Sequence, residues 1–150
     1  MASLFSYCEV RKLIPIALLV SLLCICLFLV AFTIPSQATR IYGPPAAWLT
    51  LSQRVQYSVK LLWYDGLLTR PLNEGGEAQS FVIETDESVN SVAVQLQESG
   101  LIRDAESFRA YLIYSGLDTS IQAGEYKLSA GMSAIDIAGE LQDATSTEVE

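Results

Sequence analysis

Residues 81–97 read FVIETDESVNSVAVQLQ, and residues 126–142 read YKLSAGMSAIDIAGELQ. The two stretches align without a gap at an offset of 45 residues. Each begins with a short apolar run and continues through a polar turn, a serine suited to cap a helix, and a small apolar helical stripe. The matched positions include Ser88 with Ser133, Ala93 with Ala138, Leu96 with Leu141, and Phe81 with Tyr126. The repeat predicts two copies of a strand–turn–helix unit.

A second helix is predicted between the two copies. Asp104 is a suitable N-cap, Phe108, Tyr111 and Leu112 form an apolar face, and Gly116 is a suitable stop. A strand over residues 125–128 follows. The order strand, helix, helix, strand over residues 80–128 predicts an α+β fold with two strands in one layer and both helices on one face. Residues 129–150 then begin a second unit whose closing strand is missing, so we expect a truncated copy.

An uncharged apolar segment precedes this domain. Residues 13–34 carry no charge, and a helix of that length is about 33 Å long, enough to cross the hydrocarbon core of a bilayer. Ser36 and Ala38 would suit the cleavage site of a signal peptide. The apolar segment is longer than the roughly 7–15 residues of a signal sequence, so a retained transmembrane anchor is the preferred interpretation.

The flanks of this segment predict its orientation. Arg11 and Lys12 lie on the N-terminal side, and the positive-inside tendency places residues 1–12 in the cytoplasm and everything after Pro35 outside it. The expected location is a single-pass protein of the cell membrane. Cys8, Cys24 and Cys26 all lie at or before the anchor, so no disulfide is expected in the outer part.

Residues 35–79 are predicted to form an extracytoplasmic linker. Residues 36–47 contain Gly43-Pro44-Pro45 and are expected to be non-helical. An amphipathic helix is predicted near residues 49–64, flanked by Trp48 and Trp63. This helix either lies in the membrane interface or packs on its own domain or on more of the protein, and the second interpretation is preferred. Residues 69–79 are expected to be a loop, with the folded domain starting near Ser80.

Composition excludes several kinds of chemistry. The chain has no histidine, so histidine-based acid/base pairs, triads and metal sites are excluded. No Gly-rich phosphate loop follows a strand, and no cofactor site is predicted. Residues 35–150 carry seven basic and sixteen acidic groups. That balance argues against nucleic acid or anionic lipid as a partner through bulk charge, and it is compatible with neutral glycans.

Carboxylates are the remaining candidates for catalysis. Glu84, Asp86 and Glu87 cluster in the first turn, whereas others are scattered: Glu98, Asp104, Glu106 and Glu125. Cleavage of a glycosidic bond needs a carboxyl group in a partly apolar cleft that raises its pKa. A charge-rich turn beside a helix N-terminus is the opposite environment. We therefore predict that these acids cap helices or face solvent, and that residues 1–150 hold no catalytic, cofactor-binding or metal-binding residue.

Residues 80–143 resemble the N-terminal part of the YceG-like proteins, the endolytic murein transglycosylases known as MltG. Several linked segments carry the resemblance, and a single upstream membrane anchor also fits. These segments are Gln97-Glu98-Ser99-Gly100-Leu101-Ile102, Ser107-Phe108-Arg109-Ala110-Tyr111, Gln122-Ala123-Gly124-Glu125-Tyr126 and Gly131-Met132-Ser133. One departure is Thr85-Asp86-Glu87, where the family usually has a turn that contains proline or glycine.

The resemblance implies a function. It implies that residues 80–128 form a LysM-like βααβ module that holds a catalytic domain on nascent peptidoglycan outside the membrane. Such enzymes are lyases that cleave glycan strands between MurNAc and GlcNAc without water and leave 1,6-anhydro ends. Their catalytic glutamate belongs to a larger downstream domain, so no residue here inherits that role. The implied partners are peptidoglycan glycan strands, the bilayer through one helix, and the cell-wall synthesis machinery.

A second hypothesis belongs to a different class. The chain could be a non-enzymatic, membrane-tethered protein that binds peptidoglycan or acts as a scaffold. In either case, a glycan-binding groove is expected between the turn at residues 85–88 and the loop after Leu117.

Overall fold

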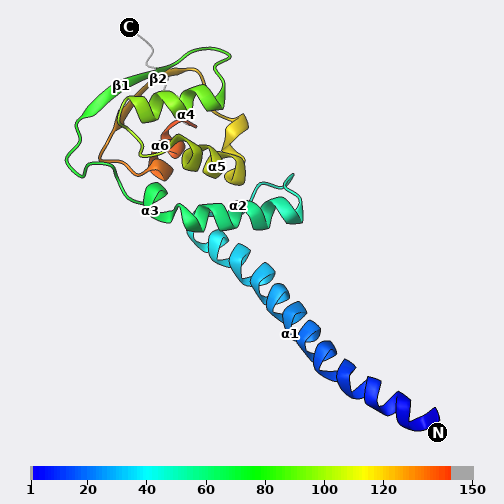
Figure 1. Cartoon of the computed structure of the whole chain (residues 1–150). Coiled ribbons are helices and arrows are strands. Elements are labelled where there is room, and N and C mark those ends of the chain that lie inside the picture. The colour runs from blue at the N-terminus through cyan, green and yellow to red at the C-terminus, as the bar shows by residue number, and fades with distance from the viewer. Residues whose placement is uncertain (1, 143–150) are drawn as a thin grey trace.

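A computed structural model describes residues 2–142 of the chain. Figure 1 shows a long N-terminal helix that projects from a small module of shorter helices and one sheet. The mixed helix and strand content confirms the predicted α+β fold. In chain order the elements are α1 (Ala2–Tyr42), α2 (Leu51–Trp63), α3 (Asp65–Leu68), β1 (Ala78–Ile83), α4 (Val89–Glu98), α5 (Ala105–Ser115), η1 (Leu117–Thr119), β2 (Gly124–Ser129) and α6 (Ala134–Glu140).

Helix α1 continues well past the apolar segment. By length and composition, its part from Ile14 to Tyr42 could cross a membrane. The predicted non-helical connector at residues 36–47 is wrong in its first half, because the helix runs through Pro35 and ends at Tyr42. Proline removes one helical N–H, and hydroxyl groups bond to carbonyls along this stretch. Thr39 Oγ1, for example, donates to the Pro35 carbonyl at 2.8 Å.

The upper end of α1 belongs to the hydrophobic core of the module. Ala38 and Tyr42 are buried in one cluster with Leu61 of α2 and Leu68 of α3. The Tyr42 hydroxyl lies 2.9 Å from the Leu61 carbonyl and 2.6 Å from Asp65 Oδ1. The expectation that the folded domain starts near Ser80 is therefore wrong, because the core begins inside α1.

The predicted amphipathic helix is present as α2. Thr50 caps it in a capping box with Gln53. Ser58 and Leu61 are buried, and α2 packs against both α1 and α5. This packing confirms the preferred interpretation of a helix that packs on its own domain. The segment after α3 is also fixed to the module, since the Asn73 N–H donates to the Ala130 carbonyl at 2.9 Å.

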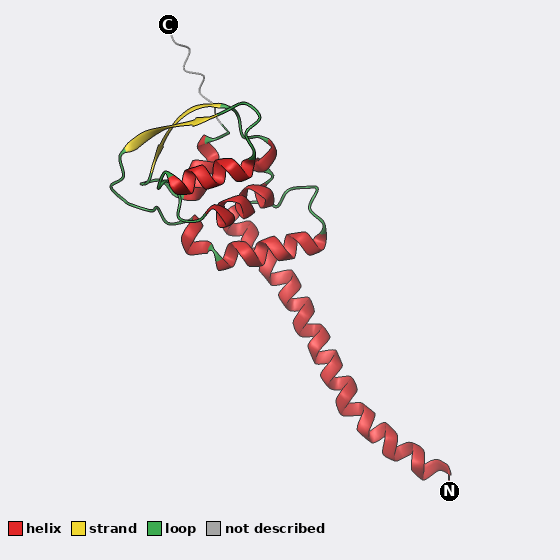
Figure 2. Cartoon of the chain, turned by 45° about the horizontal axis from the view of Figure 1, so that its top comes forward, coloured by secondary structure: helices red, strands yellow, loops and turns green. Residues whose placement is uncertain are grey.

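The two strands form an antiparallel sheet at the end of the module away from α1 (Figure 1). The register pairs Phe81 with Tyr126 and Ile83 with Gly124. Side chains alternate across the strand, with Phe81 and Ile83 buried and Val82 57% exposed. Figure 2 shows α4 and α5 beneath the sheet, with α2 and the end of α1 farther below.

Both copies of the repeat contribute to the same core. Ser88 and Ser133 each cap their helix and accept a backbone N–H three residues on, as predicted. The matched apolar residues of the two helices are buried: Val92 and Ile137, Ala93 and Ala138, Leu96 and Leu141. Helix α6 therefore completes the module that α4 and α5 begin. The expected polar tail at residues 143–150 lies outside the described residues.

Candidate functional site

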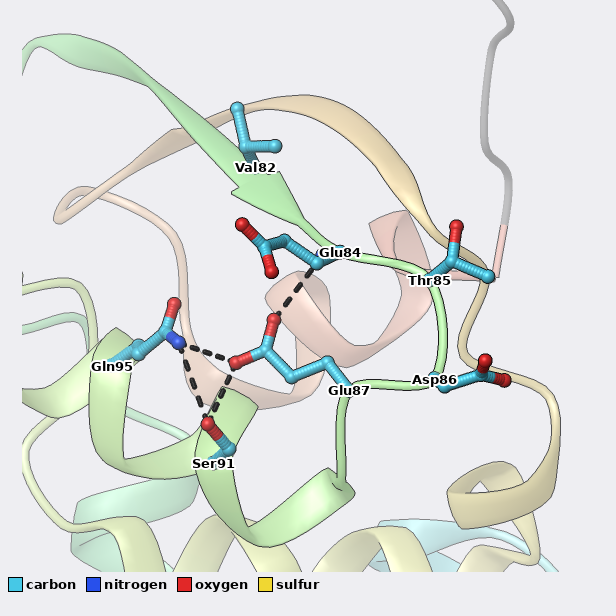
Figure 3. A pocket seen from close by; sticks show the side chains of 7 residues that line it. All are labelled: Val82, Glu84, Thr85, Asp86, Glu87, Ser91 and Gln95. Atoms are coloured by element: carbon cyan, nitrogen blue, oxygen red, sulfur yellow. Dashed lines mark hydrogen bonds between the residues drawn. The ribbon is translucent and has the colours of Figure 1, made fainter.

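An open hollow of about 440 Å³ lies at the turn between β1 and α4. Figure 3 shows the side chains that line it: Val82, Glu84, Thr85, Asp86, Glu87, Ser91 and Gln95. The turn contains Asp86 with φ of 66°, in the left-handed region that aspartate tolerates better than most residues. The predicted acidic residues Glu84, Asp86 and Glu87 thus all line this depression, although the Asp86 side chain points away from the other two (Figure 3).

Among the acids in this hollow, Glu87 forms the most hydrogen bonds through its carboxylate. Its carboxylate accepts from the Glu84 backbone N–H at 3.2 Å and from Ser91 Oγ at 2.7 Å. Gln95 Nε2 also donates to it (Figure 3). These bonds brace the turn against the first two turns of α4. Because the carboxylate is already engaged by donors from its own module, its geometry is that of a structural brace.

Sequence reasoning missed Ser91 and Gln95. Ser91 and Gln95 are four residues apart on α4, which places their side chains on one helical face, and Glu87 lies four residues before Ser91, just ahead of the N-cap Ser88. The apolar spacing predicts the buried face of this helix, and no role is predicted for its polar face. The i, i+4, i+8 spacing of three hydrogen-bonding residues was the signal that could have located this side of the hollow.

The other carboxylates have separate local roles and do not converge. Asp104 caps α5 and accepts from the Ser107 N–H at 2.7 Å, as predicted. Glu106 forms an ion pair with Lys60 of α2 at 2.9 Å. Glu125 accepts a hydrogen bond from Ser80 across the sheet. Within residues 2–142, no group of three potential metal ligands comes together.

The expected groove between the turn and the loop after Leu117 is only half right. Ile83 pairs with Gly124, so the turn after β1 and the loop before β2 lie at the same end of the sheet. The hollow, however, is lined by α4 and not by residues after Leu117. That loop turns toward α6 instead, where Gln122 Nε2 donates to the Gln142 carbonyl at 3.3 Å.

The hollow offers acceptors to a ligand but little apolar surface. Three of its seven lining residues are acids, and Val82 contributes the largest apolar group. Carboxylates accept hydrogen bonds from sugar hydroxyls. Aromatic faces are what usually supply stacking area in a binding site, and this lining contains none. The hollow therefore offers polar contacts and does not place an acid in an apolar cleft.

Comparison with known proteins gives one match. Residues 81–150 match the family model described as the YceG-like family. The match begins in β1 and runs through α4, α5, β2 and α6, and it confirms the resemblance that the sequence predicts. No curated protein and no solved structure matches the chain.

Proposed function

We propose, from the match of residues 81–150 to the YceG-like family, that this chain is the membrane-anchored N-terminal part of an endolytic peptidoglycan lytic transglycosylase. Such an enzyme cleaves nascent glycan strands between MurNAc and GlcNAc and leaves 1,6-anhydro ends. The family match is the observation that carries this proposal. Helix α1, which is long and apolar enough to span a membrane, supports a location at the cell membrane.

The role proposed for the module is positional. Helix α1 enters the core through Ala38 and Tyr42, so the anchor and the module are joined by packing and not by a flexible tether. Pro35 to Tyr42 span about 12 Å as a helix. The module is thereby held at a set distance from the end of the apolar segment. A rigid connection of this kind would hold a second domain at a fixed distance from the membrane, where newly made glycan is found.

The chemistry of cleavage is assigned to residues other than those described. The reaction needs a carboxyl group that gives a proton to the leaving oxygen. Glu87 is held by three donors in its own turn, and Glu106 is paired with Lys60. We therefore assign the acid/base step to a further domain of the enzyme, and the hollow at Glu87 to weak glycan contact at most.

The test is a cleavage assay on the gene product that contains residues 1–150. The protein is purified in detergent and incubated with uncrosslinked glycan strands, and the products are analysed by mass spectrometry. We expect shortened strands with 1,6-anhydro ends. Hydrolysed ends with a free reducing sugar, or intact strands under conditions where the protein is folded, would overturn the proposal.

A second function is favoured by the brace geometry of Glu87, whose carboxylate is occupied by donors from its own turn and from α4. We propose as the alternative a non-enzymatic tether that binds peptidoglycan. Co-sedimentation of the chain with purified sacculi separates the two. Binding without any change in strand length supports the tether, whereas cleavage supports the enzyme.

A further inference from the structure

Helices α1 and α2 enclose an apolar groove of about 400 Å³ near the point where α1 enters the module. Ala31, Phe32 and Pro35 of α1 form one wall, and Leu51 and Val55 of α2 form the other. Arg54 also lines the groove and is its one charged lining residue. In Figure 1 the junction of α1 and α2 lies at the end of the module away from the sheet of β1 and β2.

The groove lies beside the last residues of the apolar segment of α1. Ala31 and Phe32 belong to the uncharged segment that ends at Ile34, and Leu51 faces them from α2. Phe32 is 72% exposed and Leu51 is 81% exposed. An exposed apolar surface of this kind usually marks contact with a partner or a membrane. Because one wall is the end of the apolar span itself, this surface is continuous with the part of α1 that would face lipid.

Charge is strongly polarised along the module. Residues 35–72 carry four basic groups and a single acid: Arg40, Arg54, Lys60 and Arg70 against Asp65. Residues 73–150 carry three basic groups and fifteen acids. The net acidity of the outer part, which argued against contact with anionic lipid, therefore resides in its distal portion. The part next to α1 has the sign that an anionic membrane surface attracts.

Arg54 is held at the groove by backbone acceptors. Its Nε donates to the Leu49 carbonyl at 3.0 Å, and its Nη2 contacts the Ala47 carbonyl at 3.4 Å. A guanidinium group has five N–H donors in a planar fork. Two hydrogen bonds fix its position and leave other donors for a phosphate, which guanidinium groups bind with matched geometry.

We propose that the groove between α1 and α2 binds an anionic phospholipid, with an acyl chain against Phe32, Leu51 and Val55 and the phosphate at Arg54. Apolar walls at the end of a membrane span and a fixed cation at the rim match the two halves of such a lipid. A second transmembrane helix in the groove would match the apolar walls but would not use the guanidinium. The inference rests on the proposed anchoring of α1, and it adds a lipid that fixes the angle at which the module leaves the bilayer.

The test places single tryptophans in the full chain and measures quenching by brominated lipid. The background is Trp48→Phe with Trp63→Phe, reconstituted in vesicles of phosphatidylcholine and phosphatidylglycerol with or without brominated acyl chains. Leu51→Trp reports the groove and Phe28→Trp reports the apolar span. Gln56→Trp, an exposed position of α2 outside the groove lining, is the matched control.

We expect strong quenching of Leu51→Trp and Phe28→Trp and at least about twofold weaker quenching of Gln56→Trp. Quenching of Phe28→Trp alone would overturn the lipid site and leave the anchoring intact. The absence of quenching at both positions would overturn the anchoring as well. A chain that runs as a dimer, with Leu51→Trp shielded from lipid, would show that a second copy fills the groove and would also overturn the inference.

The role of Arg54 is tested by native mass spectrometry of the chain released from detergent. We expect the unmodified chain to retain phosphatidylglycerol, Arg54→Lys to retain part of it, and Arg54→Gln to lose most of it. Gln56→Ala, which changes an exposed residue of α2 outside the groove lining, is the control. Equal retention by Arg54→Gln and the unmodified chain would contradict phosphate binding at this residue.

Discussion

Phe81 and Tyr126, which occupy equivalent positions in the two copies of the repeat, face each other as partners in the antiparallel sheet. The strands pair so that every step forward along β1 is a step backward along β2. Residues 81 and 126 differ by 45, the offset of the repeat. In the antiparallel register this is the one pair in which the two partners are also equivalent positions of the repeat. An approximate twofold axis relating the two paired strands therefore passes through this pair.

The axis explains why a module of this size forms a core. Each unit on its own is a strand with one short helix, and an isolated unit of that size buries too little apolar surface to be stable. The antiparallel pairing sets Phe81 beside Tyr126, and both are buried in one core cluster with the apolar residues of the two capped helices. Helix α5 then packs against α4 and α6. Each unit is therefore stabilised by the apolar surface that it buries against the other.

The first prediction concerns Phe81, which is buried at the axis. Phe81→Ala should lower the free energy of unfolding by about 3–5 kcal/mol, because it leaves a cavity where both units meet. Val82→Ala, at the adjacent exposed position, should cost less than about 1 kcal/mol. Urea denaturation of the full chain in detergent, followed by circular dichroism, measures both. Equal losses for the two variants would contradict a core that centres on this pair.

The second prediction concerns the close approach of Gly116 to Trp48. Gly116 ends α5 with φ of 78°, and a Cβ atom added there would lie 2.8 Å from Trp48 Cη2. Gly116→Ala should therefore cost about 1 kcal/mol for the left-handed backbone, plus the displacement of the indole. Gly100, with φ of 67° and no neighbouring heavy atom within 4 Å of its added Cβ, isolates the backbone part.

Comparison of Gly116→Ala with Gly100→Ala separates the contact with the indole from the cost of the left-handed backbone. Gly116→Ala should be more destabilising than Gly100→Ala, and Trp48→Ala should reduce the difference between them. Thermal unfolding of the three single variants and of the double variant Trp48→Ala/Gly116→Ala measures these differences, and the double variant closes the cycle between Trp48 and Gly116. If Gly100→Ala and Gly116→Ala prove equally destabilising, the indole contact carries no energy.

Much of the module could be predicted from the sequence because its signals are local. Ser88, Asp104 and Ser133 each begin a helix as predicted, and Gly116 ends one. Caps and stops depend on a few neighbouring residues, so short-range patterns suffice. The apolar stripe of each helix also identified its buried face, as at Val92 and Ile137.

The parts that were wrong depend on long-range contacts. Gly43-Pro44-Pro45 predicts a non-helical connector after the apolar segment, yet α1 continues to Tyr42. The burial of Ala38 and the bonds of Tyr42 to α2 and α3 favour this continuation, and no local pattern encodes them. The lining of the hollow at Glu87 was missed for a related reason, because it joins a strand residue, Val82, to the polar face of α4.

The third prediction concerns the joint between the anchor and the module. The Tyr42 hydroxyl bridges the Leu61 carbonyl and the Asp65 carboxylate. Tyr42→Phe should lower the free energy of unfolding by about 1–2 kcal/mol, since it removes a hydrogen bond to a charged group while it keeps the ring. Denaturation of the module in detergent measures this loss.

Tyr57→Phe is the matched control for Tyr42→Phe. Tyr57 is half-buried, and in the described part of the chain its hydroxyl forms no hydrogen bond. Its variant should stay within about 0.5 kcal/mol of the unmodified chain. A loss at Tyr42→Phe no larger than at Tyr57→Phe would show that the bonds between α1 and the module contribute nothing to stability.

The fourth prediction is a loss of stability at alkaline pH. Burial raises the pKa of Tyr111 above its usual value near 10, and the charge of Asp136 adds to the effect. Burial also raises the pKa of Tyr126. The folded state therefore holds these phenolic protons more tightly than the unfolded state does. Their contribution to stability is fully present below about pH 10 and falls as the pH rises above that value.

Tyr111→Phe separates this effect from general alkaline unfolding. Within residues 2–142 the Tyr111 hydroxyl forms no hydrogen bond, and its ring packs on Tyr42 with centroids 6.2 Å apart. The variant should keep near-normal stability at pH 7, because the ring remains, and should lose less stability than the unmodified chain above about pH 10. Urea denaturation at a series of pH values measures the slopes. Identical slopes for the two proteins would show that Tyr111 ionises as readily in the folded state as in the unfolded state.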